Sequence, residues 1–253
     1  MMGERFTRAL VRAPSDAYAG CLRPENVTIN TSRARVQHNA YAAALRTAGV
    51  QVRELTPLDL PDACFVEDTA VALGESIVLT RPGALTRRQE VMTVADFFEE
   101  EGRRLIWLKA GTLDGGDVLR VGGYVLIGRS DRTDAEGVAA LAALVRDASM
   151  TPFEVPVTDR VHLKTSCSTL DAVTLIATAS TELPELAGVR VLRVPEGEEA
   201  AANCVAFNRS VIMSQGNTKT EELLRSHGFT PVPLDMSEFE KGGGGPTCLS
   251  IRY

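Results

Sequence analysis

The sequence predicts a mixed α/β protein assembled from five similar units within a single domain spanning residues 1–253. An apolar, β-rich run is followed by a polar or glycine-containing loop and then by a segment with helical spacing, and this pattern recurs every 40 to 70 residues or so. The runs begin at Arg8, Ser76, Tyr124, Val173 and Ser210, and no long linker separates them. Five such units could form a ring around a central hole or an open sheet, and both arrangements place a site at strand ends.

Individual elements follow from local signals. Four segments have the spacing of amphipathic helices, and three of these are followed by a glycine, the residue that commonly ends a helix. Two further segments alternate in hydrophobicity around a short turn, which predicts hairpins. The predicted helices are 37–48, 88–101, 134–148 and 219–227, and the hairpins are 118–127, turning at Gly122-Gly123, and 204–213, turning at Asn208-Arg209.

Composition restricts the class of protein. The chain is 44% hydrophobic with a net charge of −6, has no apolar stretch long enough to span a bilayer and begins without a signal-peptide block, so a cytoplasmic location is expected. Its five cysteines are scattered without a C-x-x-C pair, which predicts neither a disulfide framework nor a zinc site. The absence of a basic cluster favours a small-molecule partner over nucleic acid or a membrane. A homodimer is an open alternative to a monomer.

The carboxyl-terminal segment is the most informative local feature. Four glycines, Gly242 to Gly245, and Pro246 precede Cys248, which lies just before a short alternating run. Consecutive glycines permit unusual backbone conformations and a close approach of a ligand to the main chain. The segment can be a hinge with Cys248 as a small buried residue, or it can deliver a reactive thiol.

A reactive cysteine needs a base or a positive charge nearby. The chain has three histidines, and two of them favour structural roles: His38 within a helix and His227 at a helix end. His162 falls in an alternating segment that predicts a strand, with its side chain on the same face as Lys164. Cys248 and His162 are therefore a candidate pair.

Acidic and basic residues suggest what such a pair would act on. Glu67 and Asp68 interrupt an apolar run, and buried anions need partners. Two carboxylates suit a planar guanidinium better than an ammonium. Asp114 and Asp117 flank two glycines, where a turn and a functional role are equally good interpretations for Asp117. Arginines after the repeat strands, Arg81, Arg87, Arg129 and Arg132, could receive a carboxylate at a rim, so an arginine-like amino acid fits the pattern.

Taken together, these segments resemble dimethylarginine dimethylaminohydrolases, a family of the guanidine-modifying (pentein) superfamily. The resemblance runs along nearly the whole chain. It implies a five-bladed α/β propeller of repeated ββαβ units around a central channel, hydrolysis of Nω-methylated arginine to citrulline and a methylamine, and no metal or cofactor. The motifs that carry it are Pro61-Asp-Ala-Cys-Phe-Val-Glu-Asp68, Thr80-Arg-Pro-Gly-Ala84 with Arg87-Arg88, Asp114-Gly-Gly-Asp117, Arg129-Ser-Asp-Arg-Thr133, His162-Leu-Lys164, Ala202-Asn-Cys204 and Thr247-Cys-Leu-Ser250.

The resemblance also implies roles for individual residues. Cys248 would be the nucleophile, His162 the acid and then the base, and Asp114 the residue that positions His162. The implied substrate-binding residues are Asp68 and Glu67 for the guanidinium, Arg87 and Arg132 for the α-carboxylate, and Asp62, Leu22 and the backbone near Gly242 for the α-amino end.

Two alternative functions accompany this prediction. One is another guanidine-modifying reaction, the deimination of arginine or agmatine; agmatine has no carboxylate for Arg87 and Arg132. The other is a non-catalytic binding module of the same fold. The set of nucleophile, base and carboxylates favours an enzyme.

Overall fold

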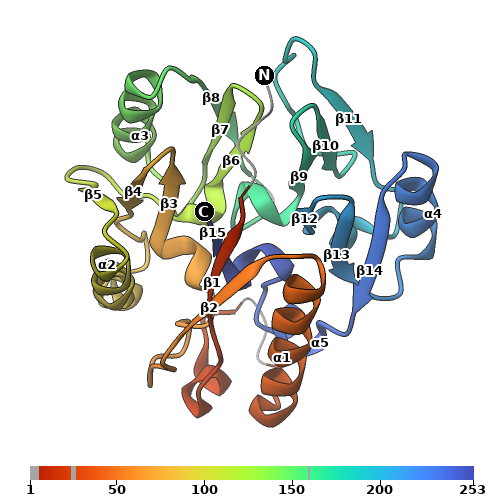
Figure 1. Cartoon of the computed structure of the whole chain (residues 1–253), viewed down its shortest axis with the longest axis horizontal. Helices are drawn as coiled ribbons and strands as arrows, with labels where there is room; N and C mark the ends of the chain where they lie inside the picture. The colour runs from red at the N-terminus through yellow and green to blue at the C-terminus, as the bar shows by residue number, and fades with distance from the viewer. Residues whose placement is uncertain (1–5, 24–26, 159) are drawn as a thin grey trace.

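A computed structural model describes residues 6–23, 27–158 and 160–253, in which five three-stranded sheets surround a common centre (Figure 1). The middle strand of each sheet pairs antiparallel with one neighbour and parallel with the other. The predicted ring of five units is therefore confirmed, and the open-sheet alternative is wrong. The sheets are β15-β1-β2, β3-β4-β5, β6-β7-β8, β9-β10-β11 and β12-β13-β14.

The strands fall where the apolar runs predict them. Both predicted hairpins are present, with Gly122 and Asn208 at positive φ in their turns. The strand bounds are β1 (Arg8–Arg12), β2 (Gln51–Leu55), β3 (Ala70–Leu73), β4 (Ser76–Leu79), β5 (Arg104–Trp107), β6 (Val118–Val121), β7 (Tyr124–Arg129), β8 (Thr151–Pro156), β9 (Cys167–Asp171), β10 (Thr174–Ala177), β11 (Arg190–Arg193), β12 (Val205–Phe207), β13 (Ser210–Ser214), β14 (Thr230–Leu234) and β15 (Ser250–Arg252).

The carboxyl terminus closes the ring. β15 pairs antiparallel with β1, with Leu10 opposite Ile251, so the last strand of the chain completes the first sheet. The backbone N–H groups of Thr7 and Arg8 both donate to the carbonyl of Tyr253. This closure holds the segment before β15, which contains Cys248, at the centre of the molecule.

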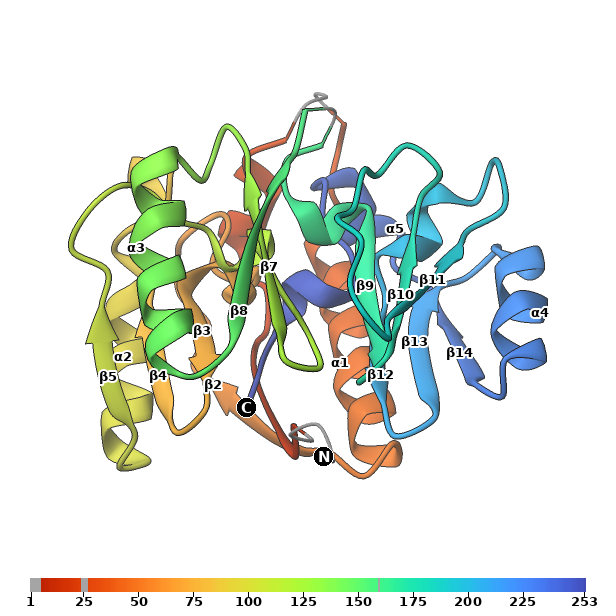
Figure 2. The same ribbon diagram turned by 90° about the horizontal axis from the view of Figure 1, so that it is seen from above.

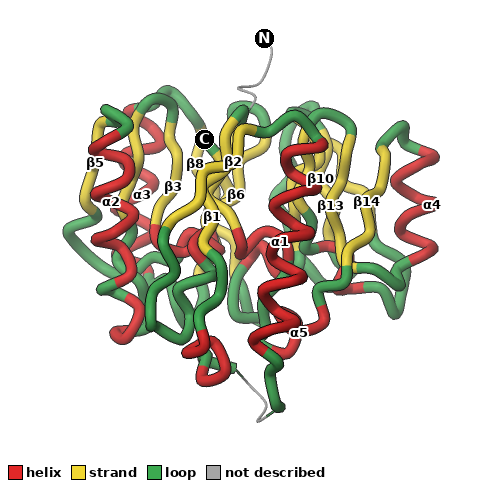
Figure 3. Tube along the Cα trace, turned by 60° about the horizontal axis from the view of Figure 1, so that its bottom comes forward, coloured by secondary structure: helices red, strands yellow, loops and turns green. Residues whose placement is uncertain are grey.

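In four of the five units a helix crosses over between the parallel strands on the outside of the ring (Figure 2, Figure 3). The predicted pattern is wrong for the unit that begins at Val173, because β10 and β11 are joined by a loop, residues 178–189, without a helix. The four crossover helices are α1 (Thr31–Thr47), α2 (Glu90–Glu100), α3 (Ala135–Asp147) and α4 (Thr218–Ser226). The prediction for α1 began six residues too late because Asn30 caps its start, accepting the N–H of Arg33. Gly49, Gly102 and Gly228 follow helices at positive φ, as expected. A short helix, α5 (Ser237–Lys241), was not predicted.

Apolar side chains fill the space between each sheet and its neighbours. In one cluster, Ile77 and Leu79 of β4 pack with Val94 and Phe98 of α2 and with Leu10 of β1. Adjacent units thus share core residues, and the ring is one packed body. Among the described residues, no helix has both the length and the apolar character needed to cross a membrane.

A ring of short 3-10 helices lines the centre of the molecule, and several of the candidate site residues lie in or next to these helices. Each one lies just before the strand that pairs antiparallel with the middle strand of its sheet. Contacts join η7 to η2, η2 to η4, η4 to η5 and η5 to η6. The repeat therefore presents five equivalent positions at one end of the channel. These helices are η2 (Val66–Thr69), η4 (Gly115–Asp117), η5 (Leu163–Thr165), η6 (Glu199–Ala202) and η7 (Pro246–Leu249).

Candidate active site

The ring of 3-10 helices gathers the chemically important residues from four units. Asp68 lies in η2, Asp114 and His162 directly precede η4 and η5, and Cys248 lies in η7. Long-range closure, rather than sequence proximity, brings these side chains to one end of the channel.

The predicted strand around His162 is wrong. His162 has extended backbone angles, but the chain turns immediately into η5, where the N–H of Thr165 donates to the His162 carbonyl. The turn sends neighbouring side chains in different directions. The His162 ring meets Asp114, whereas Lys164 reaches Glu67.

Two buried carboxylates flank the His162 ring. Nε2 lies 2.9 Å from Oδ2 of Asp114, and Nδ1 lies 3.9 Å from Oδ1 of Asp68. Burial by itself disfavours the charged ring, but Asp68, Asp114 and Asp117 outweigh it and raise the pKa of His162 to about 9. His162 is therefore an imidazolium at neutral pH.

Backbone amides hold these carboxylates in place. Asp68 Oδ1 accepts the N–H of Gly116 at 2.8 Å, and Asp114 Oδ1 accepts the N–H of Gly83 at 2.9 Å. A Cβ on Gly116 would lie 2.7 Å from both Asp68 Oδ1 and the His162 ring. Glycine is thus required at Gly116 for the carboxylate and imidazole to meet.

Asp117 is a positioning residue that the sequence left undecided between a turn and a function. It is fully buried and accepts hydrogen bonds from the Leu163 N–H and from the hydroxyls of Ser130 and Thr133. The Leu163 contact fixes the residue next to His162. Its place in the Asp-Gly-Gly-Asp motif, one residue before a strand, was the available signal.

Cys248 is a partly buried free thiol in η7, the helix that contacts η2, where Glu67 and Asp68 lie. Burial raises its pKa to about 12, and the negative charges of Glu67 and Asp68 act in the same direction. The thiol form is therefore dominant at neutral pH. Asn203, which sequence reasoning gave no separate role, fixes η7 by accepting the Thr247 N–H on its Oδ1 at 2.9 Å.

Three of the four glycines, Gly242, Gly244 and Gly245, pack closely against other side chains, whereas Gly243 is exposed. A Cβ on Gly244 would lie 2.4 Å from the Phe65 ring, and one on Gly245 would lie 2.7 Å from the Asn203 side chain. Gly243 has a φ of 74°, which disfavours other residues. The segment is a close-packed approach to Cys248, and the hinge interpretation has no support in this packing.

Arg87 was expected at a rim, but it is buried. Its guanidinium donates to Asp68 at 2.5 Å, to both oxygens of Glu90, and to the carbonyls of Asp62 and Phe65. A guanidinium has five N–H groups, so Nη1 retains one for a further acceptor. Arg87 therefore belongs first to the network that supports Asp68.

The other predicted binding residues cluster near Arg87. Asp62 is buried, accepts the Leu22 N–H at 3.0 Å, and has a pKa raised by burial against the opposing charges of Arg87 and Arg132. The Leu22 side chain is 43% exposed. Gly242 ends α5, and a Cβ there would lie 2.5 Å from the Tyr18 hydroxyl.

Arg132 is half-buried, and its backbone fixes the loop of another unit. A Cβ on Gly83 would lie 2.5 Å from the Arg132 carbonyl, so these two loops touch. The Gly83 N–H in turn holds Asp114. This contact links the predicted carboxylate-binding loop to the residue beside His162.

The two carboxylate oxygens of Glu67 differ in their hydrogen bonding. Its Oε1 accepts from Lys164 Nζ at 2.6 Å and from Arg252 Nη2 at 2.9 Å. Its Oε2 is buried and has no hydrogen-bond partner. Such an oxygen can accept a hydrogen bond from a bound cation.

Asp68, Asp114 and His162 also form a group that could hold a metal ion, because each offers a ligand atom and these atoms lie within 4.8 Å of one another. A metal would have to displace the proton of His162, whose pKa of about 9 keeps the ring charged at neutral pH. The arrangement suits proton transfer better than metal binding.

Comparison with known proteins identifies the fold of the chain. The family model "Arginine deiminase" matches residues 56–181. The crystal structure of a Pseudomonas aeruginosa dimethylarginine dimethylaminohydrolase, a cysteine-to-serine variant complexed with citrulline, superposes with a TM-score of 0.93 at 31% identity, covering 99% of this chain and 100% of the other. The fold is thus the pentein propeller that the resemblance implied.

Two curated relatives define the family more closely. The N(G),N(G)-dimethylarginine dimethylaminohydrolase of Pseudomonas aeruginosa strain PAO1 is 35% identical over 98% of this chain and 100% of its own length. The enzyme of the same name from Streptomyces coelicolor is 38% identical over 97% of this chain and 96% of its own. The chain belongs to the dimethylarginine dimethylaminohydrolase family.

Proposed function

We propose that the protein hydrolyses Nω-methylated L-arginine, asymmetric dimethylarginine or monomethylarginine, to L-citrulline and dimethylamine or methylamine. The observation that carries this proposal is an imidazolium held between two buried carboxylates, in the same ring of 3-10 helices as a free thiol. Family membership at full length and the citrulline-bound relative support the same reaction.

Substrate binding uses the carboxylates first. Asp68 and the unpartnered Oε2 of Glu67 accept hydrogen bonds from the substrate guanidinium. Arg132, with the remaining N–H of Arg87, receives the α-carboxylate. Asp62, the Leu22 backbone and the backbone at Gly242 surround the α-amino end.

The substrate activates its own nucleophile. Burial, together with the negative charges of Glu67 and Asp68, holds the pKa of Cys248 near 12, and a guanidinium bound beside the two carboxylates opposes their effect. The thiol then loses its proton to solvent and becomes a thiolate where the electrophilic carbon lies. Binding and deprotonation are thus coupled.

In the first step, the thiolate of Cys248 attacks the guanidinium carbon and forms a C–S bond. The imidazolium of His162 gives its proton to the methylated nitrogen, the C–N bond breaks, and the amine departs. The product is a covalent S-alkylthiouronium. Asp114 keeps the ring oriented toward the leaving group through its bond to Nε2.

In the second step, the neutral ring of His162 takes a proton from a water molecule that attacks the same carbon. The C–S bond breaks and Cys248 leaves as a thiolate, and the remaining hydroxyl proton passes to solvent as the carbonyl of citrulline forms. His162 is again an imidazolium, so the second half-reaction restores the starting protonation state of the ring.

Citrulline formation from asymmetric dimethylarginine tests this function. Purified protein should release equal amounts of citrulline and dimethylamine, and Cys248→Ser should release neither. Cys204→Ser, which alters a buried thiol outside the site, is the matched control and should retain activity. No citrulline from the wild type, or full activity in Cys248→Ser, would refute the proposal.

The alternatives are separated by substrate. Turnover of arginine or agmatine faster than of either methylated arginine would assign a deiminase instead. Binding of methylarginine by calorimetry without any turnover would assign a non-catalytic module.

The compartment and assembly are further expectations. All five cysteines are free thiols, which supports a reducing compartment such as the cytoplasm. The choice between monomer and homodimer is measured by light scattering of the purified chain.

A further inference from the structure

A cavity lies on the side of the ring opposite the candidate active site. It has a volume of about 480 Å³, within the range of small-molecule sites. Its lining includes Gly122, Ala172 and Asn208, which lie in hairpin turns, whereas the candidate active site lies where the first strands begin. We call this space, floored by Glu67, Lys164 and Arg252, the rear cavity.

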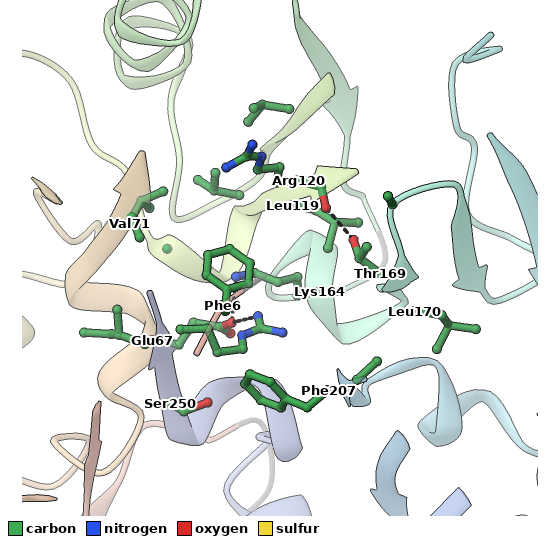
Figure 4. A pocket seen from close by; sticks show the side chains of 18 of the residues that line it. Phe6, Glu67, Val71, Leu119, Arg120, Lys164, Thr169, Leu170, Phe207 and Ser250 are labelled. Atoms are coloured by element: carbon green, nitrogen blue, oxygen red, sulfur yellow. Dashed lines mark hydrogen bonds and ion pairs between the residues drawn. The ribbon is translucent and has the colours of Figure 1, made fainter. Parts of the chain in front are cut away.

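The walls of the rear cavity are largely apolar. Figure 4 shows Phe6 standing over Glu67, with Leu119, Leu170 and Phe207 around them. Leu119, Leu170 and Phe207 are each at least 94% buried. An apolar group of matching size would gain contact with several units of the ring at once.

The charges of the rear cavity are unbalanced. The imbalance lies on the floor, where two cations, Lys164 and Arg252, face one acid, Glu67. On the floor, Lys164 and Arg252 share a single oxygen of Glu67. One carboxylate therefore offsets two buried or partly buried cations, and the floor carries an excess positive charge.

The floor also has spare hydrogen-bond donors. Lys164 has three N–H groups and Arg252 has five, and each gives one hydrogen bond to Glu67. Within the described part of the chain, their side chains make no other hydrogen bond. The two polar hydroxyls on the walls are occupied, since Thr169 donates to the Arg120 carbonyl and Ser250 pairs with Tyr41.

From these features we propose that the rear cavity is a binding site for a small organic monocarboxylate with an apolar tail. The carboxylate would accept hydrogen bonds from Lys164 and Arg252, and the tail would lie among Phe6, Leu119, Leu170 and Phe207. A carboxylate satisfies both the excess charge and the spare donors, whereas an amine satisfies neither.

Occupancy of the rear cavity has a direct route to the active site. Glu67 precedes Asp68, Lys164 follows His162 by two residues, and Arg252 follows Cys248 by four. An anion bound to Lys164 and Arg252 offsets part of the positive charge that these residues place beside Glu67, so Glu67 attracts the substrate guanidinium more strongly. This coupling rests on the proposed function and predicts a lower KM for the cationic substrate.

Binding is tested first, without reference to turnover. Phenylbutyrate is titrated by calorimetry into Cys248→Ser saturated with citrulline, which blocks carboxylate binding at the active site. Phenylbutyramide and phenylbutylamine are the matched neutral and cationic probes. Phenylbutyrate should bind at one site, at least about tenfold more tightly than either probe, because its charge is paired at the floor.

Variants then locate the site. Arg252→Leu should weaken phenylbutyrate binding by about tenfold through loss of a charged donor. Leu170→Trp fills the cavity without touching the floor and should abolish binding. It therefore tests the site independently, even if Arg252→Leu compromises folding. Arg104→Leu alters an exposed arginine of β5 and should bind normally.

The results separate the site from its coupling. No phenylbutyrate binding, equal binding of the amine, or unchanged binding in Leu170→Trp would overturn the site. If binding follows the expected pattern, phenylbutyrate should lower the KM for dimethylarginine in the wild type and leave Leu170→Trp unaffected; an unchanged wild-type KM would overturn the coupling alone.

Discussion

Replacing Gly244 with alanine tests whether the glycine segment is a packed support for Cys248. The added Cβ would lie 2.4 Å from Cε1 and 2.7 Å from Cζ of Phe65, distances that real Cβ contacts do not reach. The ring has little room to retreat, because its centroid lies 5.7 Å from that of Tyr18 and 6.3 Å from that of Phe239. Gly244→Ala must therefore displace either the aromatic cluster or the backbone leading to Cys248.

Overpacking of this kind costs about 1–3 kcal/mol of unfolding free energy. For a chain of this size that corresponds to a Tm lower by roughly 2–4 °C per kcal/mol. If the backbone takes up the displacement, Cys248 moves away from the reacting carbon, and a shift of about 1 Å can reduce the rate on the order of 100-fold.

Urea unfolding and kcat for dimethylarginine measure the two effects. Gly123→Ala is the matched control, because a Cβ there meets no atom within 4 Å. Phe65→Leu removes both clashing ring atoms, so combining it with Gly244→Ala should recover part of the loss. Wild-type stability and kcat in Gly244→Ala would refute the packing argument and restore the hinge interpretation.

Three further predictions concern the proton and hydrogen-bond network. With a thiol pKa of about 12 and an imidazolium pKa of about 9, kcat/KM should rise by about tenfold per pH unit up to pH 9 and then level, and a flat profile from pH 6 to 9 would contradict the assignment. The pKa of His162 in the folded protein, about 9, exceeds its usual value of 6.5, so the charged ring should stabilise the fold by about 3 kcal/mol below pH 6.5. This stabilisation should disappear as the pH rises through 9, and urea unfolding of the wild type compared with His162→Asn measures it. Asn203→Ala leaves the Thr247 N–H without an acceptor, so it should lower the unfolding free energy by about 1–3 kcal/mol and lower kcat more than it changes KM. Asn203→Asp keeps the acceptor and should lose less, and equal losses in both variants would argue against this role.

The local signals of the sequence were sufficient for most of the fold. Apolar runs and helix-ending glycines located the repeating strands and four helices, because these patterns depend on neighbours within one unit. The start of α1 was missed, since Asn30 acts through a cap rather than through periodicity. His162 was placed in a strand because 3-10 turns leave no periodic signal over three residues.

The sequence also indicated which residues form the site, but it did not indicate which of them contact one another. Cys248, His162 and the acids stood out as unusual residues in apolar or glycine-rich surroundings. Nothing local indicated that Arg87 is enclosed by Asp68 and Glu90, or that Glu67 faces Lys164 and Arg252. These partners come from different segments of the chain, and buried ion pairs form according to which segments converge.

By itself, the sequence determined the five repeated units, the candidate nucleophile and its histidine, and the family to which they point. Only the tertiary structure decided how the ring closes through β15, that the glycine run is packed against Phe65 and Asn203, and which carboxylates flank His162. The physical reason is the range of the interactions. Periodicity and turn preference act over a few residues. The pKa values and the steric fit at the site arise instead from residues far apart in the chain, such as Glu67 and Arg252, 185 positions apart, that only the closed ring brings into contact.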